Sequence, residues 1–98
     1  MAVYKIIWSP TASKTYIEIV RYLKSHWTYR EAKNFVDRTN EVLDHISKTP
    51  LIYSYSKESD AYKCVVAKQV TLFFRLKGDY AELLIFWDNR MDPEKLVL

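Results

Sequence analysis

The spacing of apolar residues predicts two amphipathic helices in the first half of the chain. One apolar stripe repeats every three or four residues from 12 to 27, which is the spacing of a single helix face. Ser9 suits the N-cap of this helix, and Pro10 suits its first position, where no amide hydrogen is needed. A second stripe of the same kind runs from 32 to 46.

The connection between the two stripes is short and predicts a helical hairpin. The segment His26-Trp27-Thr28 breaks the first helix, and Thr28 with Glu31 forms the capping-box pattern that begins the second. Lys48-Thr49-Pro50 ends the second helix, with a cation near its negative end. Two amphipathic helices joined so closely are expected to fold back as an antiparallel pair.

Strand patterns flank the helices. Residues 3–8 (VYKIIW) and 61–68 (AYKCVVAK) are rich in the β-branched and aromatic residues that favour strands. Between the second helix and residue 61, we interpret residues 51–53 as a short edge strand and residues 54–60 as a loop.

The most hydrophobic stretch, residues 70–90, predicts a β-hairpin that turns at Gly78-Asp79, where the only glycine of the chain lies. A two-residue turn places Phe73 opposite Leu84 and Arg75 opposite Glu82, and we expect an ion pair between the latter two. The face expected to take the helices is wholly apolar and comprises Val70, Leu72, Phe74, Leu76, Ala81, Leu83, Ile85 and Trp87. The face expected to stay partly open is mixed and comprises Thr71, Phe73, Arg75, Lys77, Tyr80, Glu82, Leu84 and Phe86.

Together these elements predict one α+β domain over residues 1–98, in the order β-α-α-β-β-β. A two-helix antiparallel hairpin would pack on one face of a small, mainly antiparallel sheet. The composition agrees, because 49% of the 98 residues are hydrophobic and 15% are aromatic. Such a chain is long and apolar enough to form one buried core.

Composition also excludes several kinds of site. A single cysteine, Cys64, rules out an internal disulfide and a multi-thiolate metal site, and its strand context predicts a buried side chain. One glycine leaves no glycine-rich phosphate loop. We therefore expect no metal and no cofactor. The chain shows no long apolar run and no signal-peptide pattern, which predicts a cytoplasmic protein with no membrane partner.

The net charge of +3 has consequences only where cations gather. The candidates near the predicted sheet are Lys57, Lys63, Lys68, Arg75 and Arg90. If they converge on the open face, they would hold a phosphate backbone and stabilise charge on a transferring phosphoryl group. Otherwise they are ordinary solvated side chains. Tyr53 and Tyr55 would either stack on exposed bases or pack the preceding loop onto the sheet.

The order and spacing of these features resemble the RelE/ParE superfamily of bacterial type II toxins, over nearly the whole chain. The residues that carry the likeness are Trp8-x-x-x-Ala12, Ala32, Phe35, Pro50, Tyr62-Lys63, and the runs LFFRL (72–76) and FWDNRMDP (86–93). The resemblance implies a toxin that is neutralised by an antitoxin made from the same operon.

Two activities follow from the resemblance, and both stay open. RelE-like members cleave mRNA on the ribosome by attack of the 2′-hydroxyl without a metal, whereas ParE-like members inhibit DNA gyrase. By position, Lys63 resembles a catalytic lysine of the RelE branch and Arg90 resembles its arginine at the end of the last strand. Thr71 stands where that branch has a second arginine, and Leu96 stands at about the position of its tyrosine. The resemblance therefore allows either an enzyme, which would be a metal-independent ribosome-dependent endoribonuclease, or an inhibitor that cuts nothing.

The resemblance also implies that an antitoxin wraps the toxin with a helix and an extended segment. Phe73, Leu84 and Phe86, on the face expected to be open, would suit such an interface. The alternative is a non-toxic binding module of the same fold, which would use its basic face for nucleic acid or its apolar patch for a protein.

Overall fold

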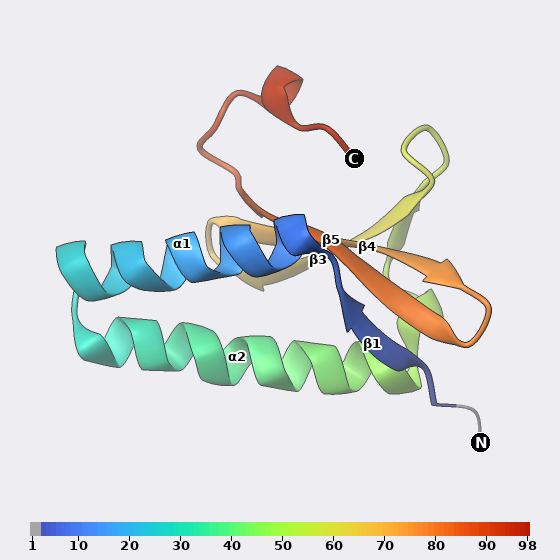
Figure 1. Ribbon diagram of the computed structural model, residues 1–98, viewed down its shortest axis with the longest axis horizontal. Helices are drawn as coiled ribbons and strands as arrows, with labels where there is room; N and C mark the ends of the chain where they lie inside the picture. Colours follow the sequence, from blue (N-terminus) through green and yellow to red (C-terminus); the bar gives the residue numbers. More distant parts are fainter. Residues whose placement is uncertain (1–2) are drawn as a thin grey trace.

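Residues 3–98 are described by the structure, a computed structural model (Figure 1), and the first two residues of the predicted domain lie outside this range. The elements are β1 (Lys5–Trp8), α1 (Pro10–His26), α2 (Tyr29–Lys48), β2 (Ser54–Ser56), β3 (Ala61–Ala67), β4 (Val70–Lys77) and β5 (Tyr80–Asp88), with short 3₁₀ helices η1 (Pro50–Ile52) and η2 (Pro93–Lys95). The strand order in the sheet is β1-β5-β4-β3-β2. β1 is parallel to β5, and the other neighbours are antiparallel. The predicted α+β class and element order are confirmed.

Both helices begin where their capping residues predict. The Ser9 hydroxyl accepts a hydrogen bond from the Ala12 amide at 3.0 Å, and the Thr28 hydroxyl accepts one from the Glu31 amide at 3.1 Å. α2 buries a full stripe against the sheet: Ala32, Phe35, Thr39, Val42 and Ile46. α1 is buried far less, because its outer half projects beyond the sheet (Figure 1).

The segment after α2 differs from the prediction. Residues 50–52 form η1, and the edge strand is β2, at residues 54–56, paired with β3. Pro50 suits the first position of a 3₁₀ turn, because its fixed φ is helical and it needs no amide partner. Tyr53 then packs its ring edge-on against Phe74, with centroids 5.9 Å apart.

The β4–β5 hairpin turns as predicted and then departs from the simple pairing. Gly78 has φ +57°, and Arg75 pairs with Glu82. Farther from the turn the register shifts, so that Phe73 pairs with Ile85 and Leu84 becomes the extra residue of a β-bulge. A one-residue shift moves every following side chain to the other face. The predicted pairing of Phe73 with Leu84 is therefore wrong.

α1 satisfies the backbone groups of β5 around the bulge. The Ser9 hydroxyl donates to the Leu84 carbonyl at 3.1 Å, and the Phe86 amide donates to the Thr15 hydroxyl at 3.0 Å. The Phe86 ring, now on the helix side, stacks on Trp8 at 5.5 Å. It also lies 5.1 Å from the Tyr16 ring. The bulge thus fixes α1 onto the sheet.

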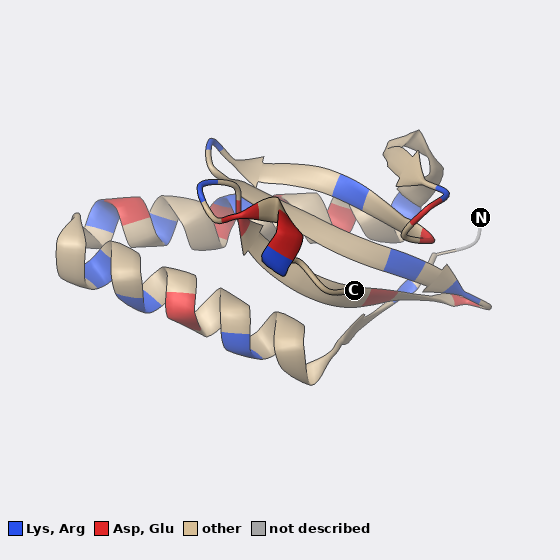
Figure 2. Cartoon of the chain, turned by 90° about the horizontal axis from the view of Figure 1, so that it is seen from above, with Lys and Arg blue, Asp and Glu red and all other residues tan. Residues whose placement is uncertain are grey.

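The same shift sends Ile85 and Trp87 to the face away from the helices. Both were expected beneath the helices, yet both are still buried, at 9% and 8% exposure. In the view of Figure 2 the C-terminal segment after β5 passes over the strands, and Leu96 within it is half-buried. Across residues 3–98, no helix combines the length and apolarity that a membrane span requires.

Candidate functional site

The two candidate catalytic cations belong to different parts of the structure: Lys63 lies in β3, and Arg90 lies in the turn after β5. Lys63 of β3 follows Tyr62, whose ring stacks on the buried Phe74 ring beneath the helices, so Lys63 points to the other face. There it pairs across the ladder with Phe73 and is exposed. Arg90 turns toward the helices, with its guanidinium carbon 5.8 Å from the Tyr22 ring of α1. The structure does not bring these two residues together.

Arg90 is held by a local ion pair. Its Nε and Nη2 atoms donate to the two carboxylate oxygens of Asp88, at 3.0 and 2.7 Å. This bidentate contact lowers the pKa of Asp88 below its ordinary value and raises that of Arg90. An arginine held in this way offers a phosphate only the donors that Asp88 leaves free.

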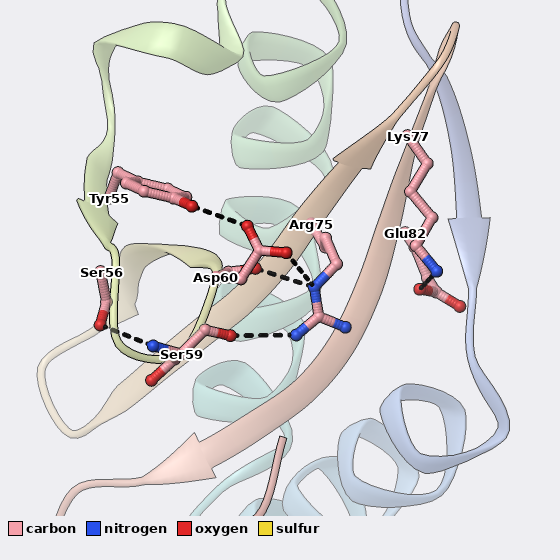
Figure 3. A network of polar contacts seen from close by, with 7 residues as sticks. All are labelled: Tyr55, Ser56, Ser59, Asp60, Arg75, Lys77 and Glu82. Atoms are coloured by element: carbon pink, nitrogen blue, oxygen red, sulfur yellow. Dashed lines mark hydrogen bonds and ion pairs between the residues drawn. The ribbon is translucent and has the colours of Figure 1, made fainter.

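Arg75 is held by the turn between β2 and β3 (Figure 3). Its Nε atom donates to the Asp60 carbonyl at 2.8 Å, and Nη2 donates to the Ser59 carbonyl at 3.1 Å. The Tyr55 hydroxyl donates to the Asp60 carboxylate at 2.7 Å, and Asp60 itself has φ +50°. The contact with Asp60 raises the pKa of Tyr55. Arg75 and Tyr55 therefore stabilise this turn, which was expected to contribute nucleic-acid contacts.

The expected ion pair between Arg75 and Glu82 is wrong. The two residues are opposite each other in the ladder, but the Glu82 carboxylate lies 3.7 Å from the Lys77 ammonium (Figure 3). Arg75 makes its contacts with the neighbouring turn because the carbonyls there accept hydrogen bonds from a guanidinium at well-defined positions.

The remaining candidates for nucleic-acid binding lie apart. Lys57 is in the turn after β2, and Lys68 is in the turn between β3 and β4, so β3 separates them. The Tyr53 ring packs on Phe74, and the Tyr55 ring lies 4.9 Å from that of Tyr62. The two tyrosines pack the sheet edge, and the five cations do not converge on one face.

The three candidate antitoxin contacts do not share one exposed surface. Phe73 is half-buried on the face away from the helices, and Leu84 is half-buried at the bulge. Phe86, expected to be exposed, is only 2% exposed among Trp8 and Tyr16. That expectation is wrong because the bulge turns Phe86 to the helix side.

Thr71 and Cys64 are both held inside the fold. Thr71 is buried, and its hydroxyl donates to the Asn89 side chain at 3.0 Å. Cys64 is 6% exposed, and burial raises its pKa, so its thiolate is disfavoured. In the described part of the chain, no group of three His, Cys, Asp or Glu side chains could hold a metal ion.

A large groove opens between the outer half of the helical hairpin and the end of the sheet. Its volume is about 950 Å³, and its apolar lining includes Ile19, Leu23, Phe35, Val70 and Phe86. Lys68 and Arg90 stand at this groove as well. The groove was not predicted from the sequence. The first apolar stripe gave an indication of it, because the stripe is longer than the sheet that the helix could cover. Trp27 ends that stripe and is 62% exposed, because the sheet does not extend so far.

Most of the chain matches a known protein family. A model of the family described as the ParE toxin of the type II toxin–antitoxin system parDE matches residues 6–93. This chain belongs to the ParE toxin family. It is thus a member of the RelE/ParE superfamily of type II toxins, as the resemblance implied. A search of curated proteins returns no match.

Solved structures share the fold at low sequence identity. A chromosomal ParDE system from P. aeruginosa matches with a TM-score of 0.73 and 13% identity, over 88% of this chain and 96% of that one. A YoeB/ParE toxin from Agrobacterium tumefaciens matches with 0.61 and 11%, over 86% and 97%. A YoeB–YefM complex from Staphylococcus aureus matches with 0.56 and 17%, over 87% and 95%. These likenesses establish that the ParE chain has the fold of such toxins.

Proposed function

We propose that this ParE-family toxin stops bacterial growth by binding DNA gyrase in the cytoplasm, without cleaving RNA. The observation that carries the proposal is that Lys63 points away from the helices, whereas Arg90, in the turn after β5, points toward Tyr22 of α1. Cleavage through the 2′-hydroxyl needs a base, an acid and phosphate-binding cations around one phosphate. Lys63 and Arg90 point in different directions, and this arrangement does not favour a shared phosphate.

Two of the candidate cations are already engaged within the fold, which also supports a toxin that does not cleave RNA. Arg90 is paired with Asp88, and Arg75 is bonded to two carbonyls of a turn. The RelE-branch positions at Thr71 and Leu96 hold side chains that cannot provide a cation or an acid. Membership of the ParE family also favours a target that is bound rather than cut.

We propose a cognate antitoxin as the neutralising partner. The groove beneath the helical hairpin is apolar and open, as a site for one face of an amphipathic helix should be. An extended antitoxin segment would bind along the sheet at Phe73 and Leu84. Phe86 would be reached only at the floor of the groove.

Expression in a bacterial host tests toxicity. We expect growth to stop when the chain is expressed alone and to resume when the neighbouring open reading frame is expressed with it. Normal growth at confirmed soluble expression would instead favour the non-toxic binding module of the same fold.

Two assays with purified protein test the target. We expect gyrase to lose its supercoiling activity, while mRNA on translating ribosomes stays intact. Lys63→Ala should keep full toxicity, because Lys63 would have no catalytic role. Cut mRNA, together with loss of toxicity in Lys63→Ala and Arg90→Ala variants that fold normally, would establish the RelE-like activity instead.

A further inference from the structure

The end of the helical hairpin farthest from the sheet exposes four aromatic rings within eight residues. Trp27 is 62% exposed and Tyr29 is 72% exposed. Tyr22 is 41% exposed, but its ring already stacks on that of the exposed His26, with centroids 4.4 Å apart, and lies 5.8 Å from the Arg90 guanidinium carbon. Trp27 and Tyr29 are therefore the rings that a ligand could use. Large aromatic rings are normally buried for most of their surface, so a group of exposed rings indicates a binding surface.

The same end of the molecule carries an excess of positive charge. Residues 21–33 hold four of the 15 Lys and Arg and one of the 12 Asp and Glu, so this segment alone has a net charge of +3, equal to that of the whole chain. Figure 2 shows the basic positions at the outer ends of both helices. Lys33 is paired with Asp37 at 2.7 Å.

Three of these cations are available to a ligand. Arg21, Lys24 and Arg30 are exposed, and within residues 3–98 they form no ion pair. They differ in this from Arg75 and Arg90, which the fold engages. We call Arg21, Tyr22, Lys24, His26, Trp27, Tyr29 and Arg30 together the tip surface.

We propose that the tip surface binds single-stranded nucleic acid. Exposed rings stack on bases, and base–ring stacking requires bases that are not paired in a duplex. Unpaired arginines and lysines beside the rings bind the phosphates between those bases. An acidic protein would use the cations and could pack apolar side chains on the rings, but only a nucleic acid alternates phosphates with flat bases that stack on each ring. The combination of free cations and exposed rings favours the nucleic acid.

This binding surface is separate from the face that carries Lys63 and from the turn held by Arg75, but Tyr22 and Trp27 also line the groove proposed for the antitoxin. Stacking and phosphate contacts break no bond, so the tip surface has no part in cleavage. The proposal does not depend on whether gyrase is the target, because it concerns the affinity of the purified chain for a strand.

Fluorescence anisotropy with the purified full-length chain tests the proposal. The probe is a labelled oligothymidine of about 12 nucleotides, within the length that such surfaces cover, and a duplex of the same length is the comparison. The decisive variant is Arg21→Gln/Lys24→Gln/Arg30→Gln. The matched control, Lys14→Gln/Lys48→Gln/Lys95→Gln, removes the same charge from exposed lysines elsewhere.

We expect the single strand to bind more tightly than the duplex. The tip variant should reduce the slope of log affinity against log salt by about 2, as expected for three lost phosphate contacts to a single strand, and the control should change it far less. Trp27→Ala should weaken binding about tenfold through lost stacking, and Trp27→Phe should retain most of the affinity. All these residues are exposed, so thermal unfolding should match that of the unsubstituted chain.

Three results would overturn the proposal. Equal loss in the two triple variants would mean that binding follows total charge, and equal affinity for the duplex would remove the role of stacking. Unchanged binding in both the tip variant and Trp27→Ala would mean that the strand binds elsewhere on the chain. Because the assay contains neither gyrase nor ribosomes, its failure is distinct from failure of the proposed function.

Discussion

A guanidinium group contributes to a fold when carbonyl oxygens are placed at the spacing of its donors. Arg75 meets this condition, because Nε and Nη2 reach the carbonyls of Asp60 and Ser59 at 2.8 and 3.1 Å. The acceptors belong to a turn whose Asp60 has φ +50°, a conformation that few side chains tolerate. The arginine therefore secures a strained turn to a central strand.

Replacing Arg75 should destabilise the protein. In Arg75→Ala the two carbonyls lose charge-assisted hydrogen bonds, and we expect the free energy of unfolding to fall by about 1–3 kcal/mol. Arg75→Lys should recover little of it, since one ammonium cannot reproduce the planar fork. Urea titration followed by circular dichroism measures the change.

The matched control for Arg75 is Lys77→Ala. Lys77 lies on the same strand, but its ion pair with Glu82 is long and exposed, so the change should stay within about 0.5 kcal/mol. An Arg75→Ala protein that kept full stability and lost toxicity would assign Arg75 to a target interface instead.

At the scale of elements, the bulge in β5 determines how α1 meets the sheet. β1 pairs with β5 only as far as Leu83, and beyond it the hydroxyls of Ser9 and Thr15 bond to the Leu84 carbonyl and the Phe86 amide. α1 and β5 are therefore joined by hydrogen bonds as well as by packing of Phe86. A helix held at two points along its N-terminal half can project its other half beyond the sheet.

Thr15→Val should weaken this joint. The valine matches threonine in shape but cannot accept the Phe86 amide, and a buried amide without a partner costs about 1–3 kcal/mol. Hydrogen exchange of the Phe86 amide should accelerate, and the urea midpoint should fall. Thr11→Val is the control, because Thr11 is exposed on the same helix. Unchanged exchange at Phe86 in Thr15→Val would show that packing alone holds the strand.

Local signals explain how far sequence reasoning reaches. Ser9-Pro10, Thr28 with Glu31, and Gly78 each act within a few residues, so the helix starts and the hairpin turn were predicted correctly. The bulge depends on contacts between residues more than 70 positions apart, so no local sequence pattern predicts it.

The errors in the candidate site follow from the bulge and from the turns. Once the register shifts at Leu84, Phe86 and Trp87 exchange faces, and a list of open-face residues becomes partly wrong. The basic residues were identified correctly as cations. Their partners were not, because Arg75 bonds backbone carbonyls and Arg90 bonds a carboxylate two residues away. Sequence patterns predict side-chain chemistry better than they predict side-chain direction.

At the scale of the whole molecule, the two faces of the sheet are covered by different means. The helices cover one face with a core that includes Phe74, Leu72 and Leu83, each 0% exposed. For the other face, the view of Figure 2 shows the C-terminal segment after β5 passing over the strands. A short segment with one 3₁₀ turn provides weaker cover than two long helices. The second face is therefore the one that a partner could uncover at the lower cost in free energy.

Removing the C-terminal segment should expose Trp87. Trp87 is 8% exposed, whereas the other two tryptophans of the chain, Trp8 and Trp27, are 36% and 62% exposed. In a chain carrying Trp8→Phe and Trp27→Phe, fluorescence reports Trp87 alone. Deletion of residues 92–98 from that chain should shift its emission to longer wavelength and increase quenching by acrylamide, because water would reach the indole.

The full-length chain with the same two substitutions is the reference for this deletion, and circular dichroism should show that the helices of both proteins are retained. Their retention is expected, since the core beneath the helices has no contribution from residues 92–98. Unchanged emission would mean that strand side chains alone bury Trp87. A shift would mean that this segment covers an apolar face beside Lys63 and Phe73, which a partner reaches only by displacing it.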